Sequence, residues 1–286
     1  MVTYGDISPA VAAYSVVRML TRAIPLLVFE KFGQTYPLPT NSTQTCKFRR
    51  YFLAGASGAA GSGSGNFFTP LSVTPLVEGV TPEGRVMSNQ DYVATLQQYG
   101  DYITITDTID TLHPDNVLAE ASDILGENAA QTIEATRFNV LKAGVNVYYA
   151  NLAANRAATV APITLADQRR VSTTLNRQNA KKITMVVKST PDFNTRSVEA
   201  AYMAVVHPDL ETDIRSMTGF KPVADYGPHM SPFEGEIGSV EQVRYVATTM
   251  SLPFTDAGAA VAGTGMRSTS GTNADVYPIL IFSRDA

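Results

Sequence analysis

The pattern of hydrophobic positions predicts one long helix near the middle of the chain. From Pro114 to about Leu152, apolar residues recur mostly at the i, i+3, i+4, i+7 spacing of a helix with one buried stripe. Pro114 suits the first turn of a helix, because its missing N–H has no partner there. The predicted stripe contains Val117, Leu118, Ala121, Ile124, Leu125, Ala129, Ile133, Val140, Leu141, Val145, Tyr148 and Leu152.

The length of this helix has a consequence for the shape of the subunit. At the usual rise per residue it is roughly 60 Å long, or roughly 45 Å if it stops at Gly144. A compact globule of the same chain length is only about 50 Å across. We therefore expect a flat or elongated subunit that buries its surplus surface against copies of itself.

Two further stretches predict a projecting hairpin. Thr45–Leu53 and Asp91–Ile109 are typical of strands, the second with a bulge at Gly100. Between them lies Gly55–Gly65, whose sequence GASGAAGSGSG offers almost no side chains to pack. So long a connection is uncommon inside a compact domain. We therefore expect an arm with a flexible tip.

The remaining pattern predicts a mixture of helices and strands. Their order is that of an α+β protein and lacks the regular alternation of strand and helix that a parallel sheet needs. The predicted helices are Ser8–Ala23, Leu165–Ala180 and Leu210–Met217, the predicted strands are Ile183–Val187, Tyr202–Val206, Val240–Met250 and Tyr277–Phe282, and Ala257–Gly271 is a predicted loop.

Composition narrows the function classes. Hydrophobic residues make up 44% of the chain, which suffices for a core, and charged residues only 17%, as in proteins that hide surface in assemblies. A net charge of -4 argues against a nucleic-acid-binding protein, although it suits a container that must not stick to packed DNA. The single cysteine, Cys46, allows no internal disulfide and fits a reducing compartment. We expect no signal peptide, because the N-terminus lacks a basic segment followed by an apolar run. We also expect no membrane span, because the most apolar short run, Ile24–Phe29, is far too short to cross a bilayer.

The chain carries little that could do chemistry. His113, His207 and His229 are far apart, and none has the ligand spacing of a zinc site. The glycines at Gly61–Gly65 lack the Lys-Ser/Thr of a phosphate-binding loop, and no G-x-S-x-G nucleophile motif occurs. We therefore expect no catalytic residue, metal or cofactor, and the residues favour a structural or assembly protein over an enzyme.

Several charged side chains are candidates for contacts between subunits. Each could equally belong to a solvated polar face, and we favour that interpretation for the hairpin unless acidic groups of a neighbour pair with it. The candidates are Lys47, Arg49, Arg50, Glu78, Glu83, Arg85, Arg169, Arg170, Lys181 and Lys182.

Eight segments, in one order over most of the chain, also carry a family resemblance. They resemble the major capsid protein family of tailed bacteriophages typified by phage N-four, a family similar in fold to the Hong Kong 97-type capsid proteins. The segments are Thr3–Pro9, Phe32–Pro39, Lys47–Tyr51, Pro75–Gly84, Gln98–Asp107, Arg137–Asn151, Val205–Arg215 and Glu236–Tyr245.

The resemblance implies an architecture. It places an N-terminal arm at residues 1–40 and an extended-loop hairpin at 41–108. A peripheral domain with a long spine helix takes 109–165 and 236–286, and an axial domain takes 166–235. Family members continue beyond the last strand, whereas this chain ends at Ala286. No motif matches the lysine–asparagine cross-link of some Hong Kong 97-type shells.

The resemblance also implies a function. Copies of the chain are expected to form pentamers and hexamers of an icosahedral head around double-stranded DNA, without sequence-specific binding, in a virion assembled in the host cytoplasm. Portal, scaffolding and decoration proteins are possible partners. The alternatives are an encapsulin-like shell around enzyme cargo, a soluble enzyme, and a tail or decoration protein.

Overall fold

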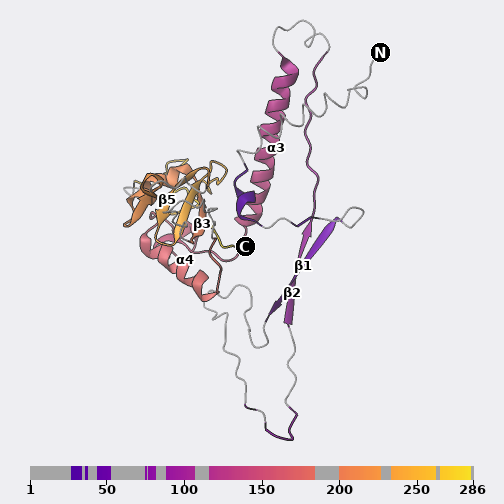
Figure 1. Ribbon diagram of the computed structural model, residues 1–286. Helices are drawn as coiled ribbons and strands as arrows, with labels where there is room; N and C mark the ends of the chain where they lie inside the picture. Colours follow the sequence, from indigo (N-terminus) through magenta and orange to yellow (C-terminus); the bar gives the residue numbers. More distant parts are fainter. Residues whose placement is uncertain are drawn as a thin grey trace, which may run out of the picture.

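The computed structural model describes residues 27–33, 36–37, 44–52, 75, 77–81, 88–106, 116–183, 200–226, 233–261 and 265–284. These residues form a β-sheet unit, a long helix α3 that rises from it, and a separate hairpin of β1 and β2 (Figure 1). The predicted helix Ser8–Ala23 and the predicted tip Gly55–Gly65 lie outside the described residues.

The sheet has five strands in the order β4-β5-β6-β3-β7. Strand β3 runs parallel to the central strand β6, and the other described neighbours are antiparallel. Two α-helices and several 3-10 turns accompany it. The strands are β3 (Tyr202–Val206), β4 (Phe220–Pro222), β5 (Glu236–Val240), β6 (Val243–Ala247) and β7 (Leu280–Phe282); the helices are α4 (Leu165–Arg177) and α5 (Glu211–Ser216); the turns are η4 (Ala150–Leu152), η5 (Arg156–Ala158), η6 (Pro208–Leu210) and η7 (Val223–Tyr226).

Strand β3 is buried on both faces, because successive side chains of a strand point to opposite sides. Tyr202, Ala204 and Val206 pack in a core under α4 and α5. Met203 and Val205 pack in a second core with the turn η3 (Phe29–Phe32) and the end of α3. The sheet is therefore covered on one side by α4 and α5, and on the other by η3 and α3.

A buried polar pair fixes α4 on its face of the sheet. The amide of Gln168 donates to the carbonyl of Val240 at 2.7 Å, and its oxygen accepts the hydroxyl of Tyr245 at 2.7 Å. Burial raises the pKa of Tyr245, so this hydroxyl stays a donor. At the start of α4, Thr164 and Asp167 cap each other in a reciprocal capping box.

Helix α3 spans Val117–Leu141, with Asn116 as its N-cap, so the predicted helix exists but ends eleven residues early. The predicted alternative, a stop near Gly144, is closer. The N–H of Lys142 bonds the carbonyl of Phe138, and the N–H of Gly144 bonds that of Leu141, which tightens the last turn. A Cβ at Gly144 would lie 3.3 Å from that carbonyl, so glycine suits the stop. Residues 145–149 then follow without helix or strand, and the N–H of Val147 bonds the carbonyl of Val145.

The hairpin pairs β1 (Thr45–Phe52) with β2 (Ser88–Thr95) in antiparallel register. The first strand is predicted almost to the residue. The second was predicted to continue to Ile109, but it ends at Thr95, where β1 offers no further partner. The N–H of Leu96 still bonds the carbonyl of Gln44, and residues 97–106 then follow outside any strand and lead toward the N-terminal end of α3 (Figure 1).

The C-terminal half corrects two predictions. The predicted strand Val240–Met250 exists as β6 but is shorter, because Val240 ends β5 and the chain turns back at Glu241, which has a positive φ of 50°. The predicted strand Tyr277–Phe282 is only its last three residues, β7. The expected boundary between the axial and peripheral domains, at residue 236, falls within this sheet, because β3 and β4 precede it and β5, β6 and β7 follow it. The domain division stays a prediction.

Candidate assembly surfaces

The hairpin has one apolar and one charged face. Phe48 lies opposite Tyr92, and Cys46 opposite Ala94, so these four side chains share a face. The side chains of Phe48 and Tyr92 are 47% and 46% exposed. The ring of Phe48 packs against that of Tyr36, with 5.8 Å between the ring centroids. A two-stranded hairpin without a covered face is marginal in water. The apolar face is therefore available to another surface.

The other face carries an ion cluster centred on Asp91. The guanidinium of Arg49 donates to both carboxylate oxygens of Asp91, at 2.7 and 3.2 Å. The ammonium of Lys47 lies 2.6 Å from the same carboxylate. Arg49 first, and then Lys47, hold the pKa of Asp91 well below its usual range. Two of the candidate contact residues thus have an acidic partner within their own hairpin.

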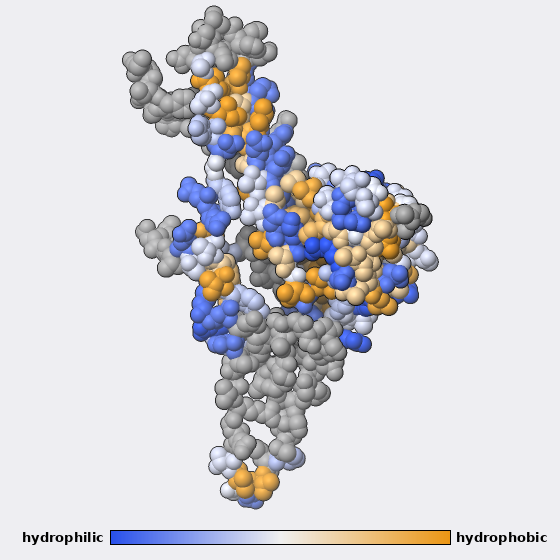
Figure 2. Space-filling model, turned by 180° about the vertical axis from the view of Figure 1, so that it is seen from behind, coloured by the Kyte–Doolittle hydropathy of each residue, from blue (hydrophilic) through white to orange (hydrophobic). Residues whose placement is uncertain are grey.

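Helix α3 exposes much of the stripe that the sequence predicted to be buried. Its buried residues are Ala121, Gly126, Ala130, Glu134 and Phe138. Leu118, Ile133 and Val140 are 42%, 43% and 72% exposed. At 3.6 residues per turn, these three and Ala129 fall within about 60° of one another around the helix. We call these four residues the outer face of α3; hydrophobic atoms are visible on this helix in Figure 2.

The predicted stripe is therefore wrong as a description of burial within one chain. The buried side of α3 consists of small residues, the carboxylate of Glu134 and Phe138. Of these, Phe138 at the end of the helix packs in the core beside the sheet. A run of exposed apolar side chains along a helix marks an interaction surface rather than scattered surface residues. The helical periodicity is present, but several of the apolar side chains that it places on one face are exposed rather than buried.

The connector after α3, residues 145–152, is a third exposed apolar segment. Val145 and Leu152 are 75% and 78% exposed. Asn151 and Leu152 both have positive φ, 53° and 58°, a conformation that a leucine rarely adopts. The carboxylate of Asp167 holds the turn by accepting the N–H of Asn151 at 3.2 Å. Leu152 is thus both in an unfavourable backbone conformation and exposed to solvent.

The other candidate contact residues are spread over the molecule. Arg169 donates through Nε to Glu241 at 2.9 Å, and Arg170 pairs with Asp167 at 3.1 Å, so each has a partner in its own chain. Lys182 lies 5.9 Å from the ring of Tyr202, and the carbonyl of Lys181 accepts the N–H of Arg284. Glu78 is exposed in a turn, Arg50 lies in β1 opposite Gln90, and Glu83 and Arg85 fall outside the described residues.

Their expected role in assembly remains a prediction. Among the described candidates, the structure brings Lys47 and Arg49 together around Asp91, whereas Arg169 and Arg170 bind different carboxylates. Sequence reasoning missed Asp91 as the shared partner and Glu134 as a buried carboxylate. The strand register supplies the signal for Asp91, since it lies directly opposite Arg49.

The described residues offer neither a metal site nor a membrane span. They contain no group of three or more His, Cys, Asp or Glu side chains placed to hold a metal ion. Within the same residues, no helix has both the length and the apolar character to cross a bilayer.

Comparison with known proteins gives a family match and a similar solved structure. Residues 90–280 match the model of a family described as phage capsid protein. Among solved structures, the capsid of Ralstonia phage GP4 is similar, with a TM-score of 0.53 and 12% sequence identity over 86% of this chain and 85% of that one. No match was found among curated protein sequences.

A mixed fold with three exposed apolar surfaces defines a subunit made for assembly. The chain belongs to the phage capsid protein family, since the matched residues cover well over half of it. It is a structural protein of a phage capsid, and its place is the multimeric shell of the virion. The expectation of an α+β phage capsid fold is confirmed.

Proposed function

We propose that this chain is the major capsid protein of a tailed phage, and that its copies form the pentamers and hexamers of an icosahedral head around double-stranded DNA. Its role is structural rather than enzymatic. The continuous outer face of α3, exposed over more than twenty residues of helix, carries the proposal. In a closed shell each added contact is effectively intramolecular, so weak contacts between copies sum to a stable container.

The parts of the subunit suit different contacts. The hairpin of β1 and β2 lies away from the sheet unit (Figure 1) and would rest its apolar face on a neighbouring copy. The unit of sheet, α4 and α5 would meet its counterparts around the local symmetry axes, as an axial domain. Helix α3 and the hairpin would form the peripheral part, with the arm before residue 27. Assembly would take place in the host cytoplasm, with portal, scaffolding and decoration proteins as further partners.

The content of the particles distinguishes this proposal from a shell around enzyme cargo. Particles purified from a phage-producing lysate are treated with DNase and then opened. The proposal requires nuclease-resistant double-stranded DNA inside particles whose main protein is this chain. Particles of the same protein that hold a protein cargo and no protected DNA would instead establish an encapsulin-like compartment.

A further inference from the structure

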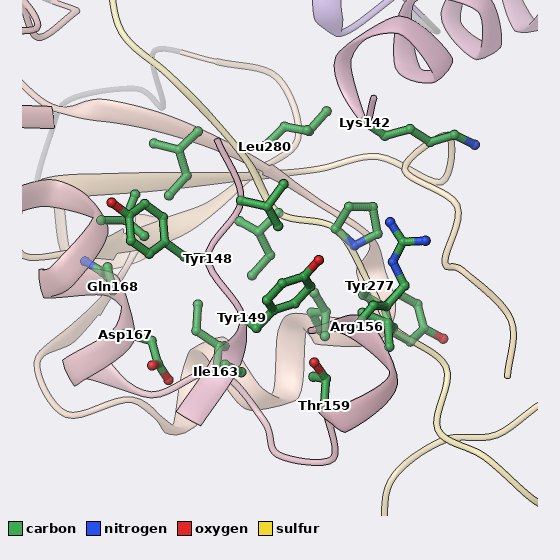
Figure 3. A pocket seen from close by; sticks show the side chains of 18 of the residues that line it. Lys142, Tyr148, Tyr149, Arg156, Thr159, Ile163, Asp167, Gln168, Tyr277 and Leu280 are labelled. Carbon is green, nitrogen blue, oxygen red and sulfur yellow. The ribbon is translucent and has the colours of Figure 1, made fainter. Parts of the chain in front are cut away.

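A large cavity lies where α3 joins the sheet unit. Its volume is about 440 Å³, within the range of small-molecule pockets. The wall is built by the end of α3, the connector, the stretch before α4, the inner side of α4, and the segment that leads into β7. Figure 3 shows side chains from these elements converging on one space, with Tyr149 near its middle. The cavity therefore touches both parts of the subunit.

The interior of the cavity is largely apolar. Ile163, Val171 and Leu175 line it from the side of α4, and Leu280 and Ile281 from β7. An apolar cavity of this size favours the hydrocarbon or aromatic body of a ligand, because burial removes that body from water.

Two cations at the α3 end of the lining lack carboxylate partners. Arg156 lies over the ring of Phe254 at 3.6 Å, and Lys142 lies 5.5 Å from the same ring. Neither forms an ion pair within the described residues. Both side chains are only partly exposed. Both cations approach the same ring, and a cation that faces a ring still has N–H donors for an anion.

The carboxylates in the same lining do not neutralise this pair. Asp167 is engaged by Thr164, Asn151 and Arg170. Asp275 accepts the N–H of Asp256 and the hydroxyl of Thr269. The remaining one, Asp213, comes from α5 and not from the elements that carry Lys142 and Arg156.

Arg170 supplies an unsatisfied buried donor. Its Nη2 donates to the carbonyl of Tyr149 and to Asp167, both at 3.1 Å. Its Nε is buried without an acceptor, the one such side-chain atom recorded among the described residues. A buried donor in this condition is usually satisfied by a group that the chain itself does not supply. Arg170 lines the cavity, so an oxygen or a water inside can reach this wall.

We propose that the cavity binds an amphipathic carboxylate, with its alkyl chain against α4 and β7 and its carboxylate between Lys142 and Arg156. Such a ligand would bridge the end of α3 and the sheet unit, and would hold them in one relative orientation. The inference rests on the subunit alone and stands whether or not the shell encloses DNA.

The test measures binding of decanoate to the purified full-length protein by isothermal titration calorimetry, with decan-1-ol as the uncharged probe. We expect saturable binding near one decanoate per chain, at least tenfold weaker binding of the alcohol, and stabilisation of the protein on heating. Lys142→Gln with Arg156→Gln should weaken decanoate at least tenfold. Arg177→Gln with Lys221→Gln is the matched control, because both side chains are exposed cations outside the cavity, and it should leave affinity unchanged.

A variant that fills the cavity separates the pocket from the surface. Val171→Phe should abolish binding of decanoate while circular dichroism stays that of the parent; if it fails to fold, the two charge variants decide. Absence of saturable binding would overturn the proposal. Equal affinity for decanoate and decan-1-ol would overturn the role of the cations, and an equal loss in the control pair would reduce the effect to net charge.

Discussion

The carboxylate of Glu134 in α3 accepts the backbone N–H of Phe29 at 3.2 Å, across 105 residues of sequence. Glu134 is fully buried, and Arg137 bridges it at 3.3 Å to Glu30 at 3.2 Å. The rings of Phe29 and Phe138 stack beside this contact at 6.0 Å. The turn η3 is thus fastened to the helix by two polar contacts and one aromatic contact.

Glu134→Ala should therefore destabilise the subunit. It leaves the buried N–H of Phe29 without an acceptor, which costs about 1–3 kcal/mol of unfolding free energy. Chemical denaturation of unassembled protein measures this loss. Glu120→Ala, an exposed glutamate of the same helix, is the control and should cost at most about 1 kcal/mol. Equal stability of the two variants would show that the Glu134 contact contributes nothing.

The sheet has no room for a methyl group at Gly238. A Cβ there would lie 2.5 Å from the carbonyl oxygen of Lys221 and 2.6 Å from the ring of Phe220. Gly238→Ala should lower the unfolding free energy by about 1–3 kcal/mol, because β4 must move away from β5. Gly100→Ala, whose new Cβ meets nothing within 4 Å, serves as the control and should change stability little. Denaturation midpoints of the two variants decide the matter.

The ion cluster of the hairpin should matter for the shell more than for the subunit. Asp91→Asn removes the anion that organises Arg49 and Lys47, all of them on the exposed hairpin. We expect an unchanged circular dichroism spectrum and a lower yield or melting temperature of assembled particles. Because the pKa of Asp91 is depressed, its contribution is present above pH 4 and is lost only as pH falls toward the folded-state pKa. Particles of Asp91→Asn that melt like the parent at neutral pH would restrict the cluster to a solvated face.

Tyr277 predicts a change of stability at alkaline pH. Burial, and then the hydrogen bond of its hydroxyl to Asp209 at 2.7 Å, raise the pKa of Tyr277 to about 12. A raised pKa means that the folded state keeps its proton longer, so this contribution is complete below about pH 10 and disappears as pH rises through about 12.

Tyr277→Phe isolates this contribution. The variant should lose about 0.5–1.5 kcal/mol at neutral pH, and its deficit relative to the parent should shrink between pH 10 and 12. Denaturation at a series of pH values measures the difference. A deficit that stays constant over the whole series would mean that the hydroxyl does not titrate as a buried donor.

The outer face of α3 tests whether the exposed apolar stripe is a contact between copies. Ile133→Ser with Val140→Ser should leave the helix intact, since the two residue types differ little in helix propensity, and should reduce particle yield. Ile124→Ser removes another exposed apolar residue, about 120° away from Leu118 around the helix, and is the control. Electron microscopy of equal amounts of each variant counts the particles.

The sequence predicted local elements better than their partners. The runs Thr45–Leu53 and Tyr202–Val206 identified β1 and β3 closely. The second run is apolar because all five of its side chains are buried in the sheet, whereas the described side chains of β1 are mostly exposed. The spacing of the apolar residues predicted helix α3. It did not predict where the helix ends, because Val145 and Tyr148 continue the same spacing in a segment that is not helical. That segment is apolar without being buried in its own chain.

Contacts between distant residues escaped prediction for a different reason. Asp91 opposes Arg49 only once the strand register is known, and Glu134 looks like any exposed helical glutamate until η3 lies on it. The turn at Glu241 was missed because a non-glycine residue with positive φ leaves little trace in the sequence. A residue pattern indicates whether a side chain is polar or apolar, but only the structure shows which distant residue it contacts.

Electron microscopy of the purified protein, paired with sedimentation velocity, tests most directly whether copies of this chain form a closed shell. The account predicts large particles with pentameric and hexameric clusters of subunits, or capsomers that convert into such particles as concentration rises. A single stable monomer, under conditions where virions persist, would contradict it.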